Sequence, residues 1–363
     1  MAFVHSYFRE KITGMSRAWI LVLALVIGWV RPTQVLAWSE GGHKIAALLA
    51  YDHLDPAQRS QVMSVLRSHP LWHEFFEAPL QAALGPNPKQ EEAERWLLAQ
   101  AAIWPDLVRP AKGSPPDANP YKAYHHPTWH YIDLPEFRQD EDRKHLGYRL
   151  SDPPEDWKPG DTEPKEGWNA VQILKKAHYE WTSKQESPAE RAVMLCWLMH
   201  LVGDVHQPCH CAELYWPHKL PKGDRGANDL SLWSMGGKSL HAYWDGLFDA
   251  RGVSLSVMES WTVTLNQEPH GAPGQRPSAS WAPEAWAKEG WAAAREYVYP
   301  ASLMVALDQA QAEHPAGGGH AIFILRLPEA DLQSYEQKAE QCAHRQILLA
   351  GDRLAEALRA AAH

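Results

Sequence analysis

The sequence predicts a mainly α-helical protein that folds as a single domain with little β structure. Apolar residues recur at helical spacing in one segment after another, whereas only one short run, residues 129–133, has the character of a strand. The 363-residue chain is long enough for a sizeable core, and no linker of distinct composition divides it into two apolar halves. A single helical domain is therefore the expected architecture.

Several helices can be placed from the residues at their boundaries. An apolar run over residues 45–51 stops before Asp55, a typical N-cap, and Pro56, which suits the first position of a second helix. A helix over residues 91–103 is expected to end at the Trp-Pro-Asp sequence that follows, because proline interrupts helices. Further helices are expected at residues 168–182, 188–206, 238–249, 253–264, 281–297 and 300–311, and a long packing helix at 332–358.

Two stretches are interpreted as surface loops or insertions. Residues 139–167 are charged and rich in proline, and residues 266–280 contain glycine and proline. The formal net charge of the chain is −9, which excludes a general basic surface. A polyanionic ligand would therefore have to be attracted by a local positive charge.

Residues 1–37 have the pattern of a secretory signal peptide. Basic residues precede a mostly apolar stretch, residues 18–30, that is too short to span a bilayer. Val35-Leu36-Ala37 then predicts cleavage before Trp38, and Met15 is an alternative start. The protein is expected to be secreted or periplasmic, without a stable membrane anchor after cleavage. Disulfides are allowed in such a compartment, and the pairing stays open for Cys196, Cys209, Cys211 and Cys342.

The stretch from His200 to His210 carries the strongest chemical signal. His200 and Asp204 are four residues apart at the end of an apolar helix, so they project from one face. Pro208 ends the helix, and His210 follows in the next turn. Three imidazoles and a carboxylate are costly to bury unless they bind something, and a zinc ion takes such ligands. The alternative is a capped core helix with incidental polar residues.

A second pair with the same spacing strengthens the metal hypothesis. His241 and Asp245 are also four residues apart on an expected helix. One such pair is usually structural. A second pair, together with His210 and with His130 in the strand-like run, favours a cluster of metal sites.

These motifs resemble those of the exported, three-zinc, single-strand-specific nucleases of fungi and plants (the S-one/P-one type), with bacterial relatives. That family shares its fold with bacterial zinc phospholipase C, and the resemblance spans nearly all of the chain after residue 37. One loop departs from the family, because Gly226-Ala227-Asn228 stands in place of Gly-Gly-Asn. The matching residues are Trp38 with His43, Trp104-Pro-Asp106, His130-Tyr-Ile-Asp133, His200 through His210, and His241-Ala-Tyr-Trp-Asp245.

The resemblance implies three zinc ions per chain. The first would be bound by Asp106, His130, His200 and Asp204. A close neighbour would be bound by His43, by the amine and carbonyl oxygen of Trp38, and by the second oxygen of Asp204. A third would be bound by His210, His241 and Asp245. His206 is expected to orient a ligand rather than to bind metal.

The resemblance also implies an endonuclease that cleaves single-stranded DNA and RNA to 5′-phosphorylated products. A hydroxide held between the closely spaced zincs would be the nucleophile, with Asp106 and Asp204 as the catalytic carboxylates that hold those zincs. Tyr131 would stack a base and Asp133 would bond to its edge, although Tyr131 could instead be a core aromatic. A 3′-nucleotidase activity on nucleotides and a monomeric state are also consistent with the family.

Two other functions are alternatives. A zinc-dependent phospholipase C would use the same cluster, but there the last ligand resembles Glu, so Asp245 favours the nuclease. Because the chain contains many tryptophans, a membrane-facing surface, as a lipase would need, stays an alternative. A non-enzymatic zinc-storing protein is disfavoured because no ligand position is missing.

Overall fold

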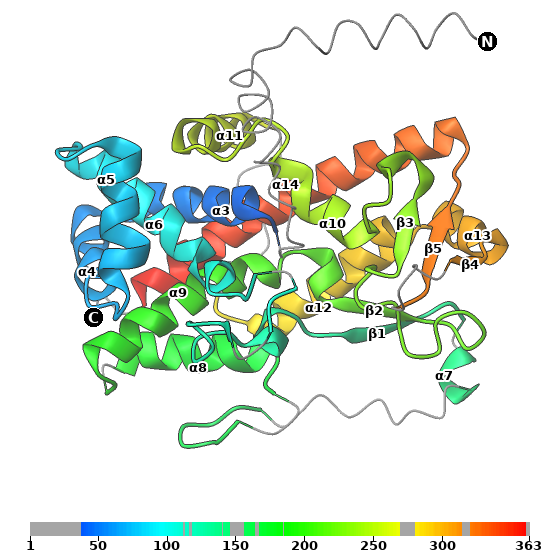
Figure 1. Ribbon diagram of the computed structural model, residues 1–363, viewed down its shortest axis with the longest axis horizontal. Helices are drawn as coiled ribbons and strands as arrows, with labels where there is room; N and C mark the ends of the chain where they lie inside the picture. Colours follow the sequence, from blue (N-terminus) through cyan, green and yellow to red (C-terminus); the bar gives the residue numbers. More distant parts are fainter. Residues whose placement is uncertain are drawn as a thin grey trace, which may run out of the picture. The chain divides into compact units, whose positions relative to one another are not determined.

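The computed structural model describes residues 38–111, 113–115, 118–139, 141–145, 156–163, 167–183, 185–268, 280–313 and 320–360. The expected signal peptide at residues 1–37 lies outside the described residues, as do parts of both expected loops. The described chain is mainly helical, as predicted (Figure 1). None of its helices has the length and apolar character needed to cross a bilayer.

Four helices from distant parts of the chain pack together. Helices α3 (Glu40–Asp52), α6 (Gln90–Leu107) and α9 (Pro188–Asp204) pack on one another, and the long C-terminal helix α14 (Glu329–Arg359), red in Figure 1, packs on α3 and α9. α14 confirms the predicted long packing helix. Helix α8 (Ala170–Ser183) covers the other side of α9, and α4 (Pro56–Leu66) contacts both α6 and α9.

Capping residues fix where two of these helices begin. Asp55 accepts a hydrogen bond from the backbone N–H of Gln58, whose side chain bonds back, and Pro56 opens α4 as predicted. Ser187 and Glu190 form the same reciprocal arrangement at the start of α9. A pair of this kind satisfies backbone donors that the helix itself leaves free.

Two of the remaining expected helices are divided in the structure. Helix α10 (Leu240–Asp245) is short and continues into a 3₁₀ turn at Gly246–Phe248, so the helix expected over 238–249 is divided. The helix expected over 281–297 is likewise divided, into α12 (Pro283–Ala293) and a π-helical turn at Ala294–Val298. The others are α5 (Ala78–Leu84), α7 (Asp142–His145), α11 (Leu255–Gln267) and α13 (Ala301–Gln309).

Two small sheets complete the described fold. Strand β1 (Leu134–Phe137) runs parallel to β2 (Ala212–Tyr215), with Leu134 opposite Ala212. Strand β3 (Leu230–Leu232) runs parallel to β5 (Ile322–Leu325), and β4 (Ala312–Glu313) is antiparallel to β5. The first sheet places the segment after His130 beside the segment after His210, and the backbone N–H of Ile132 donates to the carbonyl of His210 at 2.8 Å.

Three local predictions were wrong. The strand-like run at 129–133 is a 3₁₀ turn over Pro127–His130, opened by the fixed backbone of Pro127, and the strand begins only at Leu134. Helix α6 continues through Pro105 to Leu107, because a proline so near the C-terminus removes a single helical hydrogen bond. A helical segment at His73–Leu84 was not predicted.

Most of the large aromatic side chains belong to the core. Trp233 is 60% exposed, whereas several other tryptophans have almost no contact with solvent. The abundance of tryptophan therefore reflects packing between helices. The tryptophans with at most 1% exposure are Trp38, Trp104, Trp181, Trp197, Trp244 and Trp286.

Candidate metal centre

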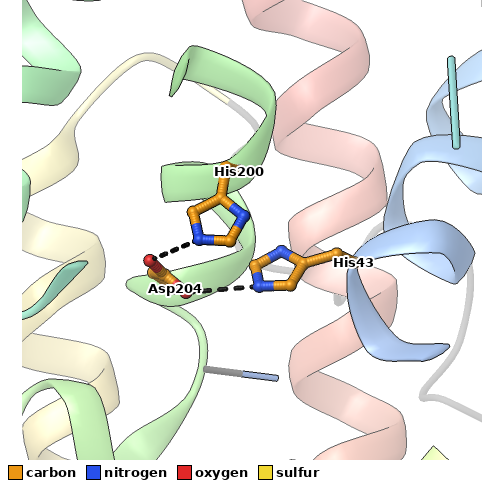
Figure 2. A group of neighbouring side chains, drawn as sticks. All are labelled: His43, His200 and Asp204. Carbon is orange, nitrogen blue, oxygen red and sulfur yellow. Dashed lines mark ion pairs between the residues drawn. The ribbon is translucent and has the colours of Figure 1, made fainter. Parts of the chain in front are cut away.

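Asp204 lies between two histidines that come from different helices (Figure 2). His43 is in the first turn of α3, and His200 is one turn before Asp204 on α9. One carboxylate oxygen of Asp204 is 3.3 Å from Nε2 of His43, and the other is 3.2 Å from Nε2 of His200. The two rings stack with centroids 4.0 Å apart. Gly203 makes this possible, because a Cβ at that position would lie 2.4 Å from Nδ1 of His43.

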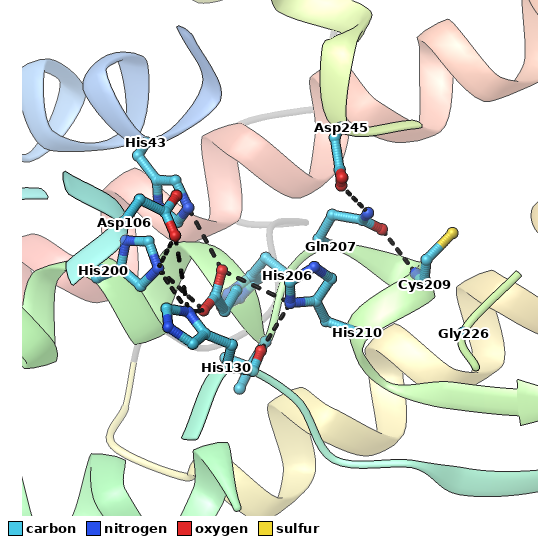
Figure 3. Close-up of polar contacts among 12 residues, drawn as sticks. His43, Asp106, His130, His200, His206, Gln207, Cys209, His210, Gly226 and Asp245 are labelled. Carbon is cyan, nitrogen blue, oxygen red and sulfur yellow. Dashed lines mark hydrogen bonds and ion pairs between the residues drawn. The ribbon is translucent and has the colours of Figure 1, made fainter. Parts of the chain in front are cut away.

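Asp106 and His130 join the same cluster from the other side (Figure 3). Nδ1 of His130 is 3.0 Å from Nε2 of His200 and 3.2 Å from Asp204. A carboxylate oxygen of Asp106, in the last turn of α6, is 3.7 Å from Nε2 of His200. The continuation of α6 through Pro105 is what keeps Asp106 on the helix and pointed at α9.

His210, His241 and Asp245 form a separate group. His241 and Asp245 are one turn apart on α10, with Nε2 of the histidine 3.4 Å from a carboxylate oxygen of Asp245. The rings of His210 and His241 are 5.0 Å apart. In the described part of the chain, three groups of His and Asp have ligand atoms close enough to share a metal: His43–His200–Asp204, Asp106–His130–His200 and His210–His241–Asp245.

Backbone carbonyls orient three of the imidazoles. Nδ1 of His200 bonds to the carbonyl of Ala102 at 2.8 Å, and Nδ1 of His210 bonds to the carbonyl of His130 at 2.6 Å. Nδ1 of His241 bonds to the carbonyl of Gly226 at 2.6 Å. A carbonyl only accepts, so each Nδ1 carries the proton and each Nε2 presents its lone pair to the site. Neutral imidazole is the form that binds a metal.

The donor set fits zinc. Two ligand atoms at about 2.0–2.1 Å from a tetrahedral zinc lie about 3.3–3.4 Å apart, which matches the His–Asp separations in two of the groups. Buried polar atoms without a hydrogen bond are costly, and a cation would satisfy those gathered here. They are one oxygen of Asp106, Nε2 of His43, Nε2 of His210, one oxygen of Asp204 and one oxygen of Asp245.

Burial and charge put most of these groups into the form that binds metal. Burial lowers the pKa of His43 to about 4 and of His130 to about 3, so both are neutral near pH 7. Burial alone would raise the pKa of Asp204, but His200 and His210 outweigh it and hold the pKa well below its usual value. Asp245 differs, because burial raises its pKa well above the usual range despite a hydrogen bond from Gln207.

A cavity of about 360 Å³ opens beside the cluster. Arg109, which sequence reasoning missed, contacts Asp106 at 2.7 Å and contributes to the wall. Only its position three residues after Asp106, just beyond the end of α6, could have indicated it. Tyr131 is 38% exposed, so it is not a core aromatic. The wall includes Arg109, His130, Tyr131, Asp133, His210, Asn228 and His241.

His206, which was expected to orient a ligand, contacts other groups, and Gln207, of which no role was expected, contacts a candidate ligand. Nδ1 of His206 bonds to the carbonyl of Val202, and Nε2 lies 2.6 Å from the guanidinium of Arg353, away from the ligands. Gln207 instead donates to Asp245 at 2.6 Å. This contact joins α9 to α10 and could not be found from spacing along the chain.

Trp38 lies at the entrance to α3 with its side chain fully buried against Phe248. The next residue, Ser39, donates its backbone N–H to the carbonyl of Asp245 at 2.9 Å. The start of the described chain is thereby attached to α10 and is five residues from His43. Binding of metal by the Trp38 amine stays a prediction.

Gly226→Ala should disrupt the group that contains His241. Gly226 has φ +60°, and a Cβ there would lie 2.4 Å from the carbonyl oxygen of Cys209. The loop would have to move, and with it the carbonyl that orients His241. Gly236→Ala is the matched control, because Gly236 has φ +61° and no atom within 4 Å of the added Cβ.

Both variants should lose about 1–2 kcal/mol of stability from the left-handed backbone, and Gly226→Ala about 1–3 kcal/mol more from the clash. Chemical denaturation and zinc content, measured side by side, check this. Equal free energies of unfolding and equal zinc contents for the two variants would show that the close approach of Gly226 to Cys209 is unimportant.

Acidification should release metal first from the group that contains Asp245. Because its pKa is raised, metal binding there must displace a proton, so affinity falls as pH falls through that pKa. Asp106 and Asp204 have lowered pKa values and stay ionised to lower pH. Zinc per chain, measured after dialysis from about pH 7 to about pH 4, should fall in steps. The variant His241→Ala should lack the first step of zinc release. If that step persists in the variant, the zinc released first does not come from the group that contains Asp245.

Comparison with known proteins agrees with the residues assembled here. The model of the S1/P1 nuclease family matches residues 38–363, which is most of the chain and includes every candidate ligand. A search of curated proteins found no match. This protein therefore belongs to the S1/P1 nuclease family, whose members are zinc-dependent nucleases.

Proposed function

We propose that this nuclease is an exported, three-zinc endonuclease that cleaves single-stranded DNA and RNA to 5′-phosphorylated products. The observation that carries the proposal is that two of the three groups of potential metal ligands contribute His130, His210 and His241 to the wall of a cavity that also exposes Tyr131. Two groups share His200, and Asp204 faces the histidines of both.

The ligand sets expected from sequence fit the positions of these side chains. Asp106, His130 and His200 would hold one zinc with one oxygen of Asp204, and the other oxygen would reach a second zinc beside His43. His210, His241 and Asp245 would hold the third. When bound, the zinc ions supply Lewis acidity that activates water for attack and offsets negative charge on the phosphate.

The protein's own side chains would position the substrate. Asp204, through its two oxygens, would keep the first two ions close together. Arg109 brings a positive charge to the cavity wall beside Asp106, where a phosphodiester could bind although the protein is acidic overall. Carbonyl contacts to His200, His210 and His241 would hold the site in one geometry before the substrate arrives.

Tyr131 and Asp133 would recognise an unpaired base. Tyr131 exposes its ring at the cavity, and a duplex would not offer its base faces to that ring. Asp133 is exposed to the same cavity, yet the surrounding protein, Glu213 and Asp224 raise its pKa to about 8. Below that pH the carboxyl can donate as well as accept a hydrogen bond at the edge of a base.

A phospholipase C activity is not favoured. The family match is to nucleases, and position 245 is Asp rather than the Glu expected of the lipase branch. The fully buried tryptophans are packed in the core and do not form a membrane-facing surface.

Cleavage assays on the zinc-loaded chain 38–363 test this function. The protein should degrade single-stranded DNA and RNA quickly, the matching duplex slowly and phosphatidylcholine not at all. Tyr131→Ala should weaken single-strand binding by about 1–3 kcal/mol, seen as a higher KM, without loss of zinc. Tyr131→Phe keeps the ring, so its KM and its zinc content should stay close to those of the unchanged protein. Hydrolysis of the lipid without hydrolysis of DNA would refute the proposal. Equal cleavage of single strand and duplex would refute strand selectivity.

Removal of residues 1–37 would complete the metal centre. In the longer chain the nitrogen of Trp38 is an amide, which does not bind zinc without losing its proton. The free α-amine has an unperturbed pKa of about 7.7–8.0, so a metal can displace its proton near neutral pH. The burial of Trp38 at the entrance to α3 supports its approach to the zinc expected beside His43.

A protein that retains Met ahead of Trp38 should therefore bind less zinc and cleave more slowly than a protein that begins at Trp38. Mass spectrometry must verify both N-termini, and a chain that begins at Trp38 with its α-amine acetylated serves as a further comparison. Equal zinc content and equal rates for the two chains would exclude Trp38 as a ligand while leaving the other eight positions untouched.

A further inference from the structure

Gln207 joins the end of α9 to α10 through two short hydrogen bonds (Figure 3). Its side chain is fully buried. Oε1 accepts from the backbone N–H of Cys209 at 2.6 Å, and Nε2 donates to one carboxylate oxygen of Asp245 at 2.6 Å. The same side chain thus contacts the turn that carries His210 and the helix that carries Asp245.

The chemistry of the partners determines which way the amide points. The N–H of Cys209 can only donate, so the atom facing it must be the amide oxygen. The amide nitrogen must then face Asp245, and it can only donate. Gln207 therefore fixes one oxygen of Asp245 as a hydrogen-bond acceptor.

This contact leaves the other oxygen of Asp245 directed at the metal group. That oxygen has no hydrogen-bond partner in the described structure and is 3.4 Å from Nε2 of His241. The separation is that of two ligands on one tetrahedral zinc, about 3.3–3.4 Å. His241 and His210 are each oriented by a hydrogen bond from Nδ1 to a backbone carbonyl, whereas Asp245 is oriented by a hydrogen bond from a side chain.

We propose that Gln207 is the positioning residue that sets the metal affinity of the group His210, His241 and Asp245. It would act by holding Asp245 in the orientation that binds metal, without itself touching the ion. The inference rests on the zinc-dependent function proposed above. Loss of a partner that orients a ligand typically lowers metal affinity about 10–100-fold.

Gln207→Glu separates this role from simple packing. The change nearly preserves size and keeps an acceptor for the N–H of Cys209, but it replaces the donor that faces Asp245 by a second carboxylate oxygen. The variant should hold one zinc fewer per chain than the unchanged protein in buffered zinc. Affinity for that zinc should fall about 10–100-fold, while the remaining zincs are retained. If Gln207 only supports the turn at Cys209, zinc content should not change.

Gln100→Glu is the matched control. Gln100 is also buried, and its Nε2 donates to the carbonyl of Phe75 at 3.0 Å rather than to a candidate ligand. This variant should keep the zinc content of the unchanged protein. His241→Ala identifies which zinc is affected: combined with Gln207→Glu, it should lose no more zinc than either single variant.

Elemental analysis and the absorption spectrum of the cobalt-substituted protein give the result without any substrate. Full zinc content in Gln207→Glu, loss of more than one zinc, or the same loss in Gln100→Glu would each overturn the inference. Failure of the nuclease proposal would appear separately, as a zinc-loaded unchanged protein that does not cleave single-stranded DNA.

Discussion

Asp204 places the strongest constraint on the fold, because its carboxylate is fully buried and must still stay ionised. An isolated carboxylate cannot do so in surroundings of low polarity. Histidines reach it from several directions: His43 from α3, His200 from the preceding turn of α9, and His130 from the 3₁₀ turn. Helices α3 and α6 therefore have to pack on α9 in one arrangement. The absence of a side chain at Gly203 is part of that arrangement, since it admits the ring of His43.

The sequence was most informative where the chemistry is local. His200 with Asp204 and His241 with Asp245 are each separated by one helical turn, so helix formation alone brings their side chains together, as the structure confirms. The capping residues at Asp55 and the apolar spacing of α14 were predictable for the same reason. The ligand sets themselves came from the resemblance to a family, and the structure shows that those side chains do converge.

Other features depend on contacts between distant segments and could not be read from spacing. Gln207 reaches Asp245 only because α10 packs beside the end of α9, and a pattern match gives no reason to prefer Gln207 over His206. The run at 129–133 alternates like a strand, yet Pro127 starts a 3₁₀ turn that directs His130 inward. At Pro105 a helix was expected to end, but α6 continues past it. The contact of Gln207 depends on tertiary packing, whereas at Pro127 and Pro105 the local effect of proline differed from the one expected.

The candidate ligands lie far apart along the chain, from His43 near its described start to Asp245 about 200 residues later. Each bound ion would act as a non-covalent cross-link, and closing long loops restricts the unfolded chain most strongly. Metal binding would then stabilise the folded chain, and more so as the free metal concentration rises, because only the folded chain assembles the ligands. The supply of zinc would consequently govern how much of the protein is folded as well as how active it is.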